Sequence, residues 1–260
     1  MLPNLFNFDQ QVIGFVLVFF RIAGLMLYAP LFGSARVPRR FKVLIALVMT
    51  PPMVLNGLPP NIPMPESLGV LTIGLAGELC FGLVLGMVVS LVFIAAQWAG
   101  EMVGQQVGLN ISEVLDPQFG GGGSVVGDLY FMIATAAFLF LDGHRQLVIG
   151  VYESLITCPP LSSFFTENIF HFILDALYSA TKLALRISAP VFVTMLIVDI
   201  SMGCISKTMP QLNVMSAGMA IRGMLGMLVL AIGAGAVGKA ISSMLTAHLD
   251  KMTELFAPPM

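Results

Sequence analysis

The chain has 260 residues and a formal net charge of -2; 57% of its residues are hydrophobic and 10% are charged. Soluble domains have about 45–50% apolar and about 25% charged residues. The composition, with a mean hydropathy of +0.94, therefore excludes a water-soluble protein and predicts an integral membrane protein. Because the basic residues are spread along the chain apart from one cluster, nucleic acid is not an expected partner.

Three apolar segments in the first part of the chain predict helices of unequal length. Residues 12–31 match the roughly 20 residues that cross a bilayer, and we expect them to be retained because no Lys or Arg precedes Arg21, as a signal peptide requires. Residues 43–55 contain Pro51-Pro52 and are short for a span, whereas residues 68–98 are longer than a straight span needs. The loop before residue 43 is predicted to be cytoplasmic by its basic residues, Arg36, Arg39, Arg40 and Lys42.

Two helical hairpins are predicted in the second part of the chain. The first joins residues 125–141 to residues 146–157 through a tight turn. The second joins residues 169–202, with a kink at Pro190, to residues 214–245. Because the segment lengths are irregular, we expect some helices to be broken, tilted or packed against protein.

Between residues 95 and 124 the sequence changes from apolar to polar. Gly100, Gly104 and Gly108 recur every four residues, so on a helix they share a face and let a neighbouring backbone approach closely. Glu101 and Gln105 lie beside them, and such side chains are costly in lipid. We therefore predict a helix that faces protein or water, with these five residues at a helix or subunit interface.

A glycine-rich segment follows this helix. Asp116-Pro117 is predicted to end the helix, because proline has no N–H and disfavours helical backbone in the residue before it. Consecutive glycines visit backbone conformations closed to other residues, which predicts a mobile loop. The loop consists of Asp116, Pro117, Gln118, Phe119, Gly120, Gly121, Gly122 and Gly123.

Charged residues inside the apolar segments allow two interpretations. They could form an ion path, as in a secondary transporter, or opposite charges could pair between helices or subunits. We favour pairing, because acidic Glu78 and Glu101 lie in the first half and most of the basic residues lie in the second, so that docking the halves would neutralise both. Arg21 and Asp199 depart from that pattern. The charges are Arg21, Glu78, Glu101, Lys182, Arg186, Asp199 and Arg222.

Catalytic and metal-binding patterns are weak. The three histidines lack HExxH spacing, and no P-loop is present. Ser179–Lys182 matches S-x-x-K without its companion motifs. We expect no enzymatic activity, no cofactor and no metal site. The cysteines Cys80, Cys158 and Cys204 are expected to be small buried side chains.

Several motifs together resemble the FliR family of type III secretion export-gate proteins. They are APLFGSARVPRRFKVLIAL (29–47), AGEMVGQQVGLNISEVLDPQ (99–118), LDGHRQLV (141–148), ISAPVF (187–192) and MPQLNVMSAGMAIR (209–222). The resemblance covers nearly the whole chain in order. It implies a FliP-like N-terminal portion, residues 1–165, fused to a FliQ-like C-terminal hairpin, residues 166–260.

The resemblance also implies a function. Such a chain would assemble with FliP-like and FliQ-like subunits, beside FlhB-like and FlhA-like components, into a channel for unfolded secreted proteins. It would lie in the bacterial inner membrane, in contact with lipid, at the flagellar basal body. The loop 116–123 maps onto the family's plug. The alternatives are an injectisome subunit, a secondary transporter, whose inverted repeats are not visible here, and an intramembrane enzyme.

Overall fold

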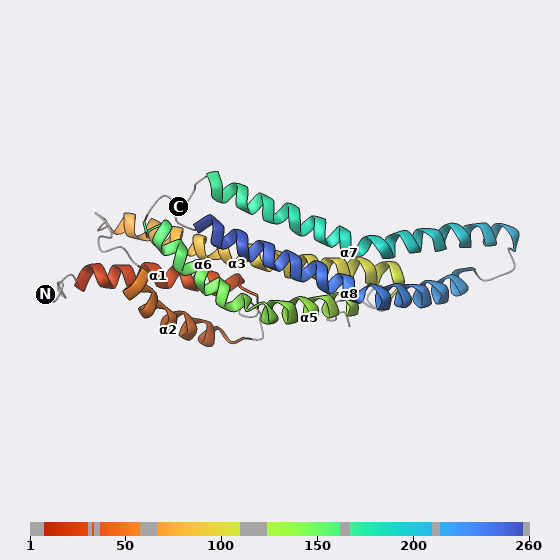
Figure 1. Ribbon diagram of the computed structural model, residues 1–260, viewed down its shortest axis with the longest axis horizontal. Helices are drawn as coiled ribbons and strands as arrows, with labels where there is room; N and C mark the ends of the chain where they lie inside the picture. The colour runs from red at the N-terminus through yellow and green to blue at the C-terminus, as the bar shows by residue number, and fades with distance from the viewer. Residues whose placement is uncertain are drawn as a thin grey trace. The chain divides into compact units, whose positions relative to one another are not determined.

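The computed structural model describes residues 8–30, 33, 37–57, 67–109, 124–161, 167–209 and 214–256. All regular structure within these ranges is α-helical, which confirms the predicted all-α class. Figure 1 shows the helices along the chain: α1 (Phe8–Tyr28), α2 (Arg39–Gly57), α3 (Leu68–Val107), α5 (Val125–Phe140), α6 (Gly143–Thr157), α7 (Glu167–Thr208) and α8 (Val214–Phe256).

Four helical segments of the described ranges are long and apolar enough to cross a membrane: Gln11–Tyr28, Leu68–Val107, Ile169–Thr208 and Ala217–Phe256. Helices α5 and α6 pass the same test when they are taken together, and counting this bent pair as one span gives up to 5 spans. The chain is therefore a multi-pass membrane protein. Helix α2 is not among these spans, as its short apolar segment predicted.

Two sequence predictions about the helices are wrong. The axes of α5 and α6 are bent by 65° at a short break, so these helices do not form the predicted hairpin. The break consists of Leu141 and Asp142, and Asp142 has φ 51, a left-handed conformation that redirects the chain without reversing it. In addition, α3 ends at Val107, well before the predicted breaker at Asp116-Pro117.

The chain forms two compact units that interleave along the sequence. Unit 1 comprises Met1–Leu91, Leu139–Leu177 and Leu245–Met260, and unit 2 comprises Val92–Phe138 and Tyr178–Met244. Helices α3, α7 and α8 therefore contribute to both units, and the last two residues of α5 belong to unit 1. This division follows packing within the chain. The predicted boundary between FliP-like and FliQ-like portions concerns family descent and stays a prediction.

In unit 1, helices α1 and α3 pack backbone to backbone. A Cβ atom added to Gly24 would collide with the carbonyl oxygen of Leu79, and one added to Gly82 would collide with the carbonyl oxygen of Arg21. One turn further along α3, a Cβ on Gly86 would lie 2.8 Å from the carbonyl oxygen of Leu25. Glycines spaced by four residues thus allow close approach of two helices. These glycines of α3 come earlier in the chain than Gly100–Gly108, the series for which the sequence predicted such an approach.

Replacing Gly82 by Ala should push α1 away from α3 and destabilise the chain by about 1–3 kcal/mol, as overpacking does. The expected observation is a lower midpoint of thermal unfolding for the purified chain in mild detergent. Gly77 on the same helix is a matched control, because a Cβ there would meet nothing within 4 Å. Gly77→Ala should be neutral or stabilising by about 0.5–1 kcal/mol. Equal midpoints for the two variants would contradict the close approach of α1 and α3.

Candidate functional site

Arg21 of α1 and Glu78 of α3 form a buried ion pair in unit 1. The Nε atom of Arg21 donates to Oε2 of Glu78 at 2.5 Å, and the two residues are only 1% and 5% exposed. The guanidinium also lies 4.3 Å from the centre of the Phe81 ring. The glycine contacts between α1 and α3 bring these two charges together, since a wider helix separation would open the pair.

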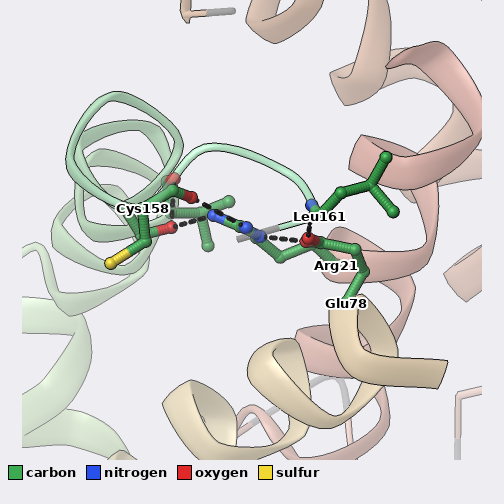
Figure 2. Close-up of polar contacts among 6 residues, drawn as sticks. Arg21, Glu78, Cys158 and Leu161 are labelled. Atoms are coloured by element: carbon green, nitrogen blue, oxygen red, sulfur yellow. Dashed lines mark hydrogen bonds and ion pairs between the residues drawn. The ribbon is translucent and has the colours of Figure 1, made fainter. Parts of the chain in front are cut away.

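The rest of the Arg21 guanidinium is satisfied by the end of α6 (Figure 2). Nη1 donates to the hydroxyl of Ser154, and Nη2 donates to the carbonyl oxygen of Cys158, both at 3.1 Å. On the other side, Oε1 of Glu78 accepts from the backbone N–H of Leu161 at 3.3 Å. A buried ion pair is tolerated when its remaining hydrogen-bonding groups are satisfied in this way. The network thereby joins α1 and α3 to the segment that follows α6.

The cysteines do not match the prediction of small buried side chains. All three are free thiols, and Cys80 and Cys204 are exposed while Cys158 is half-buried. At Cys158, burial raises the pKa of the thiol. The thiol therefore stays protonated at neutral pH, and the residue serves Arg21 through its backbone carbonyl. No group of three His, Cys, Asp or Glu side chains that could hold a metal ion occurs in the described ranges.

Asp199 and Arg222 form a second ion pair, in unit 2. Nη2 of Arg222 on α8 donates to Oδ1 of Asp199 on α7 at 2.5 Å, with both side chains about half-exposed. Charges therefore pair between helices, but each pair lies within one half of the sequence. The expectation that docking the two halves would neutralise Glu78 and Arg222 is wrong, because each is paired with a residue from its own half of the sequence.

The other predicted charges lie in unit 2. Lys182 and Arg186 are exposed on α7, one turn apart, and Glu101 is half-buried on α3. The structure does not bring either cation to a carboxylate within the part of the chain that it describes.

The predicted plug residues, Asp116 to Gly123, lie outside the described residues. The residues on either side of this segment, and those packed against them, are described. We call these residues the stem of segment 110–123. The stem comprises Gly100, Gly104, Val107, Gly108, Ser124, Gly127 and Gly226. All of these residues belong to unit 2.

Gly108 ends α3 by taking a left-handed conformation. Its φ is 83°, which is open to glycine at little cost. The N–H of Leu109 donates to the carbonyl oxygen of Gly104 at 2.9 Å, and the N–H of Gly108 donates to that of Gln105 at 3.2 Å. These two bonds define a Schellman cap, which satisfies the last carbonyl groups of a helix. Gly108 therefore ends the helix and does not belong to the packing face that the four-residue spacing predicted. Of the other predicted interface residues, Gly104 is buried and Gln105 is exposed.

Ser124 begins α5 on the other side of the segment. Its hydroxyl accepts from the N–H of Gly127 at 3.3 Å, as in a helix N-cap, and donates to the carbonyl oxygen of Gly100 at 3.4 Å. A Cβ on Gly100 would lie 2.5 Å from Cα of Gly127, so α3 and α5 touch through their backbones. Close packing at Gly100 thus occurs within this chain.

A third helix packs against the stem. A Cβ on Gly226 of α8 would collide with the side chain of Val107, the last residue of α3. Further along α5, the ring of Phe93 contacts Phe131 and Phe138 at centroid distances of 5.8 Å and 5.7 Å. Segment 110–123 thus begins and ends on helices that are packed together.

Ser124, Gly127, Gly226 and Ser154 were not predicted as site residues. Ser124 could have been found, because Ser directly before an apolar run is a helix-start signal. The other three carry no local signal. Their roles depend on partners far away in the sequence, such as Arg21 for Ser154 and Val107 for Gly226.

Comparison with known proteins agrees with this architecture. Residues 12–248 match the family described as bacterial export proteins, family 1. The chain belongs to this export family. The Flagellar biosynthetic protein FliR of Bacillus subtilis (strain 168) is 26% identical over 247 residues, which is 94% of each chain.

Further FliR proteins match the export-family chain at similar identity. That of Pectobacterium carotovorum subsp. carotovorum is 27% identical over 233 residues, covering 88% of this chain and 87% of the relative. That of Escherichia coli (strain K12) is 25% identical over 198 residues, covering 76% and 75%. The predicted resemblance to the FliR family is confirmed.

In this export-family chain, Glu78→Gln should destabilise unit 1 by about 3–5 kcal/mol, because Arg21 would stay charged and buried without its carboxylate. The measurement is the thermal unfolding midpoint in mild detergent. The control is Lys251→Gln, which removes a 3.4 Å ion pair to Asp175 whose side chains are 53% and 67% exposed. Exposed pairs contribute about 0–1 kcal/mol. A loss of stability in Glu78→Gln no larger than in the control would show that the buried pair is not a main determinant of the fold.

Proposed function

We propose that this chain is a non-enzymatic subunit of the flagellar protein export apparatus in the bacterial inner membrane, at the flagellar basal body. Membership of the bacterial export family and the names of its relatives support this proposal. The relatives cited are flagellar proteins, so the flagellar apparatus is favoured over an injectisome. The multi-pass helical architecture agrees with such a place.

The proposal includes an assembly. The chain would join FliP-like and FliQ-like subunits, next to FlhB-like and FlhA-like components, to form a channel for unfolded proteins. Large apolar side chains stay exposed on α7 and α8 in unit 2, among them Val193 and Leu196 on α7 and Leu228 and Ile232 on α8. Apolar patches of this kind mark contacts with lipid or with other subunits.

One observation carries the proposed place of the channel gate. Segment 110–123 leaves α3 at a Schellman cap and returns at the Ser124 N-cap, and the two ends are joined by the contact of Gly100 with Gly127. The stem would hold the plug residues predicted from the sequence at a defined place in the assembly. No bond-making chemistry is needed for this role.

A secondary transporter is less well supported. The ion path that such a protein would need was predicted from the intramembrane charges. Arg21 and Glu78 are instead buried in a network in which each nitrogen of the guanidinium has a hydrogen-bond partner, and Asp199 is paired with Arg222. Four of the candidate charges thus have structural partners.

Co-expression tests the assembly. The tagged chain, produced with FliP-like and FliQ-like subunits and extracted in mild detergent, should appear in native mass spectrometry as one large hetero-oligomer. Exposed apolar helices that need partners are the physical reason. A monomer or homodimer under these conditions would contradict the export-gate proposal, and ion flux in liposomes would then test a transporter.

Gly100→Ala tests the stem within that assembly. The new Cβ would lie 2.5 Å from Cα of Gly127 and should displace the start of α5, so we expect a higher ion conductance of the complex in planar bilayers. The matched control is Gly223→Ala on α8 of the same unit, where a Cβ meets nothing within 4 Å. Native mass spectrometry shows whether each variant still assembles. A Gly100→Ala complex that assembles and has unchanged conductance would contradict a role of the stem in gating.

A further inference from the structure

A groove of about 380 Å³ lies within unit 2, between α5, α7 and α8. Its α7 wall includes Arg186, Ile187, Pro190 and Val191, and its α8 wall includes Lys239. Tyr130 of α5 also contributes to the lining. All lining residues belong to the same compact unit, so the groove does not depend on how the two units are arranged.

Two cations line this groove, and its other lining residues are apolar except for Tyr130 and Ser243. Arg186 and Lys239 come from different helices, and no acidic residue is part of the lining. Neither cation has an ion pair with a carboxylate in the described part of the chain. Lys182 is exposed one helical turn before Arg186 and adds to the positive charge on this side of α7. Cations on membrane helices usually pair with an opposite charge, so an anion is the ligand that suits this groove.

The α8 wall leaves space beside these cations. Gly233, Ala236 and Ala240 recur at helical spacing along the groove, and a Cβ on Gly233 would meet nothing within 4 Å. Val229 and Leu230 extend the apolar surface further along the same helix. The groove therefore combines a positively charged part with an apolar channel that is bounded by small side chains.

We propose that this groove binds an anionic phospholipid, with its phosphate between Arg186 and Lys239 and an acyl chain against the apolar walls of α7 and α8. Both helices belong to segments long and apolar enough to cross a membrane, so lipid has access to them. Basic pockets between membrane helices are a recurrent site for acidic lipid head groups. The planar guanidinium of Arg186 suits bidentate binding of phosphate oxygens, and the ammonium of Lys239 supplies a second charge.

The size of the groove favours a lipid over a helix of another protein. An α-helix with its side chains is about 10–12 Å wide, and a few turns of it occupy far more than the volume of 380 Å³. A phosphate group and part of an acyl chain fit that volume. A partner helix would cover the opening of the groove without filling it, and would have to carry acidic side chains to pair with the two cations.

The test is native mass spectrometry of the full-length chain, purified in mild detergent and titrated with phosphatidylglycerol or, as the zwitterionic comparison, phosphatidylcholine. The wild type should bind phosphatidylglycerol preferentially. Arg186→Gln and Lys239→Gln should each weaken that binding about tenfold or more, as loss of a charged hydrogen bond does. Lys207→Gln, which removes an exposed cation at the end of α7 outside the groove, is the matched control and should bind like the wild type.

A second variant tests the apolar part. Gly233→Leu keeps both cations, narrows the apolar part of the groove and has room for its side chain, so it should fold normally and still lose phosphatidylglycerol. Equal binding of the two lipids by the wild type would overturn the proposal. So would full binding by Gly233→Leu, because the cations would then attract lipid without the groove. A photo-crosslinker at position 233 that labels only another subunit of the assembled complex, with no lipid retained, would assign the groove to a protein partner.

Discussion

The close approach of α1 and α3 is the contact on which unit 1 depends. Gly24, Gly82 and Gly86 let the two backbones touch, and this places Arg21 beside Glu78. A guanidinium that is 1% exposed is stable there only because a carboxylate, a hydroxyl and a carbonyl group surround it. Packing by small residues and burial of charge therefore act together. The glycines set the distance between α1 and α3, and the buried ion pair makes their arrangement specific.

Unit 2 uses the same kind of contact for another purpose. Gly100 meets Gly127, and Gly226 meets Val107, so three helices converge where segment 110–123 begins and ends. The caps at Gly108 and Ser124 satisfy the helix ends at this point. Helices packed in this way define the position of a segment that emerges from them.

Two classes of charge can be distinguished on the membrane helices. Arg21, Glu78, Asp199 and Arg222 are used within the chain, where they join helices. Arg186 and Lys239 line a groove and are exposed. A charge on a membrane helix usually has a partner. The first class therefore stabilises contacts between helices of this chain, and the second indicates a partner outside it, either lipid or a neighbouring subunit.

The sequence alone determined the membrane class, the helical fold, most helix positions and the export family, because hydropathy and motif order are local properties that are read directly from the residues. Tertiary structure decided which charges pair and which glycines are in contact. Arg21 and Ser154 are far apart in the chain, and nothing local relates them. Gly108 shows the limit most clearly: its four-residue spacing from Gly104 suggested a packing face, whereas its positive φ, a property of the folded backbone, makes it the end of the helix.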